Sequence, residues 1–258
     1  MDIHKPKPVH DWRGFVGEIG IIVIGVLIAL SAEQIVDSLR WNERVQETRA
    51  QLKGEIADDA GSAIVWLSAS PCLDQQLATL SEQVWVTRRT GVFAGVAQRF
   101  APTLVMFKSD AWLNARSLQV SDHLRQKEVS QFSDFYFFPT ELTGDVTTLH
   151  QEAAELQPLA RPLDRVTPAE ADGFLASIGR AQELQSRMEL AAIFLIRRAE
   201  QLGAMTPLSN VQHTTARERQ VYGACVADPN EVLKLLRSNA SYDDVMTALH
   251  LAKPVRPQ

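Results

Sequence analysis

The chain has 258 residues, of which 45% are apolar and 22% charged, and this length allows one or two domains around an ample hydrophobic core. Such a composition excludes a disordered, collagen-like or low-complexity chain. Lys and Arg number 26 against 31 Asp and Glu, which gives a net charge of −5. A phosphate-binding surface needs clustered positive charge, so we expect no nucleic acid among the partners.

The first marked feature is an apolar run close to the N-terminus. Residues 19–30 contain no polar side chain, and Glu18 and Ser31 are the only polar side chains of the wider stretch 15–32. At about 1.5 Å per residue, this stretch spans roughly 27 Å as a helix, which matches the hydrocarbon core of a bilayer. Because it lacks a polar face, we predict a single membrane-spanning helix at residues 15–36, in contact with membrane lipid.

Two other interpretations of the apolar run stay open. A cleavable signal peptide also has a basic start and a short apolar run, and Ala29-Leu30-Ser31 is compatible with a cleavage site. Against cleavage, Glu18 stands at the head of the run, and residues 27–52 contain no Gly or Pro, which indicates a helix that continues out of the membrane. The other alternative is a buried helix of a soluble protein.

Charge gives little information about membrane orientation. Three Lys or Arg precede the apolar run, and three more follow it within residues 33–52, so the positive-inside bias is nearly balanced. Long downstream domains translocate largely regardless of charge. We predict that the short tail at residues 1–14 lies inside and that the large C-terminal domain lies outside.

Within the membrane helix, a stripe of small residues carries one acid. At 100° per residue, Glu18, Gly25, Ala29 and Ala32 fall within about 60° of one another. Gly25 and Ala29 form a small-xxx-small pair, which lets two helix backbones approach closely. Glu18 either reaches water at the headgroup level or hydrogen-bonds to a partner helix. We predict this stripe as an interface with another membrane protein or with a second copy.

Beyond the membrane, apolar residues keep helical spacing almost throughout. A stalk helix is predicted to about residue 69, and Ser70-Pro71 is typical of the start of a second helix that ends near residue 90. Residues 91–102 are expected to form a loop. Further helices are predicted at residues 109–118, 124–138, 142–156, 168–202, 215–226, 229–236 and 242–251. Pro139 either kinks or interrupts the helix between residues 138 and 142.

These predictions define the fold class and the domains. The class is all-α, with an N-terminal transmembrane helix that continues into a stalk and a helical bundle. The stalk and the first part of the bundle take residues 37–157, and a proline-containing connector leads to a C-terminal helical part at 158–258. Strand-like alternation is confined to residues 104–107, which is too short for a sheet.

The N-terminal motifs resemble those of a bacterial family of uncharacterised single-pass membrane proteins. Gly17-Glu18-Ile19, the Gly-x-Leu-Ile-Ala-Leu core at residues 25–30, Ala32-Glu33-Gln34 and Trp41 carry the resemblance, which covers residues 17–59. A common form of the family has Asn-Asn-Trp-Asn-Glu directly after the core, whereas here Trp41-Asn42-Glu43 lies further on. The resemblance implies a membrane-anchored helical protein, and it implies no activity. Together with the predicted orientation, the expected location is the bacterial inner membrane, with the C-terminal domain in the periplasm.

The sequence contains none of the common catalytic or metal-binding motifs. None of the six histidines has another His or Cys three or four positions away, and phosphate-loop, dinucleotide and nucleophile-elbow motifs are absent. Asp58-Asp59 and Asp243-Asp244 are adjacent acids, and neighbours on a helix diverge by about 100°, so solvated faces are expected. We therefore predict no enzyme, no cofactor and no metal, although catalytic groups far apart in sequence form no such motif.

Cys72 and Cys225 leave two alternatives. Two cysteines are too few for a disulfide framework, and two unpaired buried thiols are the favoured interpretation. A domain outside the cytoplasm allows a single disulfide between them.

Residues 132–138 are rich in aromatic side chains, and Phe135, Tyr136, Phe137 and Phe138 follow one another directly. Four consecutive side chains of a helix cannot all face one core, so we predict that some of them contact a partner, a second domain surface or the membrane interface. A helix inside a thick bundle would show the same pattern.

The leading hypothesis is a membrane-anchored interaction or accessory protein that binds other envelope or membrane proteins, or itself. The alternative is an extracytoplasmic helical bundle that senses a small molecule between its helices. Because about fourteen residues precede the membrane helix, such a sensor is expected to act through a partner.

Overall fold

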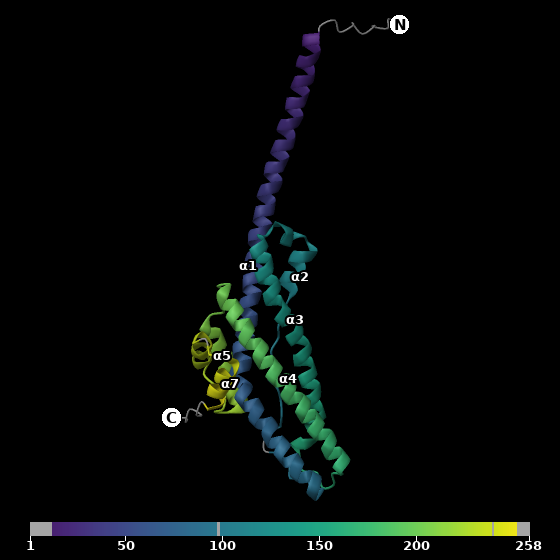
Figure 1. The fold of residues 1–258 in the computed structure, drawn as a ribbon, viewed down its shortest axis with the longest axis vertical. Helices are drawn as coiled ribbons and strands as arrows, with labels where there is room; N and C mark the ends of the chain where they lie inside the picture. The colour runs from purple at the N-terminus through teal and green to yellow at the C-terminus, as the bar shows by residue number, and fades with distance from the viewer. Residues whose placement is uncertain (1–11, 97–98, 239, 252–258) are drawn as a thin grey trace, which may run out of the picture. The chain divides into compact units, whose positions relative to one another are not determined.

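In the computed structural model, the described residues are 12–96, 99–238 and 240–251, and they form a helical protein (Figure 1). These residues contain no strand, and one isolated antiparallel bridge joins Phe93 to Leu163. The predicted all-α class is confirmed. The helices are α1 (Trp12–Thr90), α2 (Asp110–Ser117), α3 (Gln126–Glu155), α4 (Pro168–Gln201), α5 (Leu208–Tyr222), α6 (Pro229–Arg237) and α7 (Tyr242–Leu251), and 3-10 turns cover Val120–His123 and Gln157–Ala160.

The chain divides into two units, Met1–Arg49 and Ala50–Gln258. The described residues of the first unit belong to the N-terminal part of α1, and their large apolar side chains from Trp12 to Leu39 are exposed. This part of the helix is long and apolar enough to cross a membrane, and none of its most apolar stretch is buried. The predicted apolar N-terminal helix is present, and it is a candidate membrane span.

In the second unit, the other helices pack against the C-terminal part of α1. Figure 1 shows α2 and α3 on one side of this part and α5 and α7 on the other. Residues 63–73 of α1 are all buried, so the helix has neighbours on every side there. The apolar positions predicted for the stalk helix from residue 52 onward are fully buried: Leu52, Ile56, Ala60, Ala63 and Leu67.

The boundaries of α4 follow the local signals in the sequence. Thr167 caps its first turn by accepting a hydrogen bond from the Glu170 N–H at 3.2 Å, and the Glu170 carboxylate accepts one from the Thr167 N–H at 2.7 Å. The helix ends at Gln201, shortly before Gly203, which has a φ of +62°. The predicted apolar face is buried along most of its length: Ile178, Ala181, Leu184, Met188, Ala192, Leu195 and Ala199.

The predicted break before Ser70-Pro71 is wrong, because α1 continues through Pro71. A proline inside a helix has no N–H for the carbonyl four residues earlier. Contacts from distant parts of the chain stabilise this turn. The Ser68 carbonyl accepts a hydrogen bond from the Ala227 N–H at 2.8 Å, and the Ser70 hydroxyl donates one to the Glu189 carboxylate.

Two other helices differ from their predicted extents. Pro139 lies inside α3 and does not interrupt it, so of the two alternatives left open at this proline the structure has the continuous helix. Helix α5 begins at Leu208, directly after Pro207, whereas the apolar spacing indicated a start near residue 215. The first half of α5 has few apolar residues and therefore shows little periodicity.

Candidate functional site

The predicted membrane-helix interface lies on the exposed N-terminal part of α1. Glu18, Gly25, Ala29 and Ala32 are all exposed there. A Cβ atom placed on Gly25 meets no atom within 4 Å, so this face is open to a close neighbour. Its use by a partner helix stays a prediction.

The predicted aromatic partner surface is divided by the fold. Phe135 and Tyr136 are buried, and this corrects their assignment to a surface. The Tyr136 ring stacks on Trp112 with a centroid distance of 5.9 Å, and its hydroxyl donates to the Leu52 carbonyl at 3.4 Å. Burial, with a contribution from Glu55, raises the pKa of the Tyr136 hydroxyl above its ordinary value. These two residues belong to the core.

Phe137 and the half-buried Phe138 form a cluster with Phe194 of α4, in which Phe137 and Phe194 are exposed. Phe137 is 63% exposed, and Phe138 stacks on Phe194 with centroids 5.8 Å apart. Phe137 meets Phe138 edge to face at 5.5 Å. We call Phe137, Phe138 and Phe194 the aromatic surface. It borders a depression of about 480 Å³, at whose edge Asp134 and Arg198 lie 3.9 Å apart.

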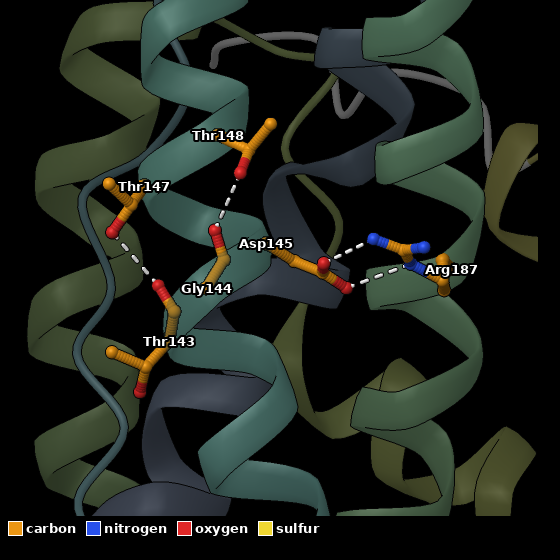
Figure 2. A network of polar contacts seen from close by, with 6 residues as sticks. All are labelled: Thr143, Gly144, Asp145, Thr147, Thr148 and Arg187. Atoms are coloured by element: carbon orange, nitrogen blue, oxygen red, sulfur yellow. Dashed lines mark hydrogen bonds and ion pairs between the residues drawn. The ribbon is translucent and has the colours of Figure 1, made fainter.

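Ion pairs hold the two helices that carry the aromatic surface. Figure 2 shows the Arg187 guanidinium of α4 donating to both carboxylate oxygens of Asp145 in α3. Arg180 binds Glu152 in the same forked manner at 2.7 and 2.9 Å. The hydrogen bonds from Arg180 lower the pKa of Glu152. Two forked pairs fix the register of α3 against α4.

The paired positions follow one antiparallel register. From Asp134 through Phe138 and Asp145 to Glu152, the steps along α3 are 4, 7 and 7 residues. Their partners on α4 follow the same steps in the reverse direction: Arg198, Phe194, Arg187 and Arg180. A heptad spacing of this kind is typical of helices that pack side by side over several turns. The aromatic surface therefore lies on two helices that pack side by side over several turns.

A buried carboxylate links three helices of the second unit. Glu189 of α4 is only 3% exposed, and it accepts hydrogen bonds from Ser70 of α1, from Gln185 at 3.1 Å and from Tyr242 of α7 at 3.1 Å. Burial raises the pKa of Glu189 to about 7, and the charge of Asp74 adds to the shift. The network holds the first residue of α7 to the centre of the bundle.

The two acids at Asp58-Asp59 have different environments. Asp58 is exposed and lies 3.7 Å from the Lys108 ammonium. The prediction of a solvated face is wrong for Asp59, which is fully buried and accepts a hydrogen bond from the Lys108 N–H at 2.9 Å. Burial raises the pKa of Asp59 to about 8. The two carboxylates diverge, as the helical angle predicts.

Cys72 and Cys225 form a disulfide, which corrects the favoured interpretation of two unpaired thiols. Their Cα atoms lie 5.3 Å apart across 153 positions of sequence. The bond joins the Pro71 turn of α1 to the segment between α5 and α6. The Ala227 N–H bonds to the Ser68 carbonyl beside it, so a covalent bond and a hydrogen bond fix the same junction.

Among the described residues, no three His, Cys, Asp or Glu side chains gather into a set of metal ligands. His123 and His213 are exposed, whereas His150 is half-buried and its Nε2 atom is enclosed. His4 and His10 lie outside the described residues.

Comparison with models of protein families, with curated proteins and with solved structures finds no match to this chain. The fold and the site define an all-helical bundle with an apolar N-terminal helix and an exposed aromatic surface. Sequence reasoning missed Phe194 and Glu189. Phe194 lies off the predicted buried face of α4, and Glu189 follows Gln185 by one turn directly beside that face, which is a signal of a buried polar pair.

Proposed function

We propose that the protein is a membrane-anchored helical interaction protein that binds other envelope or membrane proteins, or a second copy of itself, and catalyses no reaction. The observation that carries this proposal is the aromatic surface on α3 and α4. Large aromatic side chains gathered on an exposed face are typical of the centre of protein interfaces. One acid and one base at its edge, Asp134 and Arg198, provide charges of both signs for a partner.

The proposal places the N-terminal part of α1 in a bacterial inner membrane and the C-terminal domain in the periplasm. The exposed apolar side chains of this helix support the first point, since lipid is the solvent that suits them. The Cys72–Cys225 disulfide supports the second, because disulfides persist in oxidising compartments such as the periplasm.

Extraction and protease accessibility test this location. We expect the intact chain to stay with membranes in alkaline carbonate, and protease added to spheroplasts to digest the C-terminal domain. Release by carbonate, or a domain protected until the inner membrane is opened, would contradict the anchoring or the orientation.

Affinity purification from solubilised membranes tests the interaction. We compare the unmodified chain with a Phe137→Ser, Phe194→Ser double variant, and Leu113→Ser on α2 is the control because Leu113 is similarly exposed. We expect a recurrent partner, or a second tagged copy, to be recovered with the unmodified chain and the control and to be lost with the double variant. A monomer without a recurrent partner, or equal recovery by all three, would overturn the proposal.

A further inference from the structure

A second hollow in the bundle has the features of a ligand site. A groove of about 370 Å³ lies between α1, the extended residues 104–108 and the segment from Thr206 to the first turns of α5. Its volume is in the range of small-molecule sites. Apolar side chains make up much of the lining: Val65, Leu104, Val105, Met106 and Val211.

Two of these apolar side chains are strongly exposed. Leu104 is 76% exposed and Met106 is 68% exposed, whereas Val105 and Phe107 between and after them are buried. This alternation follows from the extended backbone, in which successive side chains point to opposite faces. The Lys108 N–H bond to Asp59 fixes the segment on α1. Two large apolar side chains are thus held at a hollow, where a ligand can cover them.

The charges at the groove have opposite signs. The Lys108 ammonium and the Asp58 carboxylate lie 3.7 Å apart, and their side chains are 48% and 67% exposed. This distance exceeds the 2.7–2.9 Å of a close charge-assisted hydrogen bond, so each group retains capacity for another partner. Further polar groups come from residues that also line the groove: Ser62, Thr206, Asn210 and Thr214.

We infer that this groove binds a small zwitterion with an apolar side chain, either an apolar α-amino acid or a short peptide. The ligand ammonium faces Asp58, its carboxylate faces Lys108, and its side chain covers Leu104 and Met106. A simple anion is repelled by the Asp58 carboxylate, and a simple cation is repelled by the Lys108 ammonium. A zwitterion places an opposite charge against each of them. The inference is independent of the aromatic surface, and it gives small-molecule sensing a defined site.

Calorimetric titration of the detergent-solubilised full chain tests the ligand class. The probes are leucine, leucyl-leucine, leucinamide, which lacks the carboxylate, and N-acetyl-leucine, which lacks the ammonium. We expect saturable binding of leucine or of the dipeptide. Each blocked analogue is expected to bind about tenfold more weakly or worse, the usual effect of losing one hydrogen bond to a charged group.

Two variants locate the binding. Asp58→Asn and Lys108→Gln are each expected to weaken the leucine or dipeptide affinity by about tenfold. The Lys108 contact that fixes the backbone is made by its N–H, so Lys108→Gln retains it. Arg88→Gln is the matched control, since Arg88 pairs with Asp172 outside the groove. It is expected to leave binding unchanged.

A glycine pair tests the shape of the groove. A Cβ on Gly61 would lie 3.0 Å from the Thr206 Cγ2 atom, so Gly61→Ala narrows the groove and moves the Thr206 side chain by a few tenths of an ångström, and it is expected to weaken binding. Gly54, on the same helix, has no atom within 4 Å of such a Cβ, and Gly54→Ala is expected to bind normally. Circular dichroism confirms that both variants fold.

Three results would overturn the inference. The first is the absence of saturable binding by leucine and by the dipeptide. The second is binding of leucinamide or N-acetyl-leucine as tight as that of the zwitterion. The third is an Asp58→Asn or Lys108→Gln variant that binds as well as Arg88→Gln.

Discussion

The two parts of α1 are both rich in apolar side chains, yet their side chains have opposite environments. In the first unit these side chains are exposed on all sides, from Phe15 to Leu39. In the second unit, between Leu52 and Val84, apolar side chains repeat at helical spacing and are buried by other helices. Apolar content alone therefore does not distinguish a membrane span from a core helix. The length of the apolar run does, because the fully buried residues 63–73 are too few to cross a bilayer.

The largest expected effects come from two separate variants, each of which places one charged side chain in one part of α1. Ile56→Arg puts a charge at a fully buried position, and its cost is comparable with the whole stability of a domain, so we expect the second unit to unfold. Leu27→Arg costs about 2.5–3.5 kcal/mol for membrane insertion and is expected to reduce membrane retention while the bundle stays folded. Circular dichroism and carbonate extraction measure the two effects. Unfolding by Leu27→Arg would contradict the distinction.

The next largest effect is expected from removal of the Cys72–Cys225 disulfide in the second unit. A Cys72→Ala, Cys225→Ala double variant is expected to lose about 2–5 kcal/mol of the free energy of unfolding. The bond closes a long stretch of chain at the Pro71 turn. Thermal unfolding should show the same loss when a reductant is added to the unmodified protein. A reductant that leaves the unmodified protein unchanged would show that the bond does not stabilise it.

The buried carboxylates predict a pH dependence. Burial raises the pKa of Glu189 from 4.5 to about 7, so the folded state binds its proton more tightly than the unfolded state does. The resulting stability is fully present below about pH 4.5 and is lost as the pH rises through 7. Asp59, with a pKa raised from 3.8 to about 8, acts with the same sign. The free energy of unfolding is therefore expected to fall between pH 5 and 8.

Denaturation of three variants across this pH range isolates the contribution of Glu189. Glu189→Gln is expected to remove up to about 3 kcal/mol of the pH-dependent loss, as the shift of its pKa implies. Asp59→Asn is expected to flatten the dependence as well. Asp37→Asn, in the exposed part of α1, is the control and should leave the slope unchanged. An unaltered slope in Glu189→Gln would contradict the assignment.

The outcome of sequence reasoning depended on whether a signal was local. The capping residues Thr167 and Glu170 and the apolar period of α4 are local, and they predicted that helix correctly. The continuity of α1 through Pro71 depends on Ala227 and Glu189, which no local pattern brings to this turn. For the same reason, two of the three residues of the aromatic surface were predicted and the third was not. Phe137 and Phe138 are neighbours in sequence, whereas Phe194 joins them only through the register of α3 against α4.

The smallest expected effects come from two glycines of α1 that have open space around them. Neither Gly25 nor Gly54 has an atom within 4 Å of a Cβ placed on it. Gly54→Ala, in the exposed interior of a helix in water, is expected to raise the free energy of unfolding by about 0.5–1 kcal/mol through helix propensity.

Gly25→Leu is expected to leave the unfolding of the bundle unchanged, because Gly25 lies outside the second unit. If the small-residue stripe is an interface, the bulkier side chain prevents the close approach of a second helix and lowers the yield of cross-linked partner. Denaturation measures the stability of the bundle, and cross-linking in membranes measures the association through the small-residue stripe. A Gly25→Leu chain that cross-links as well as the unmodified one would remove the stripe from the interface, and the aromatic surface would then be the partner contact that remains.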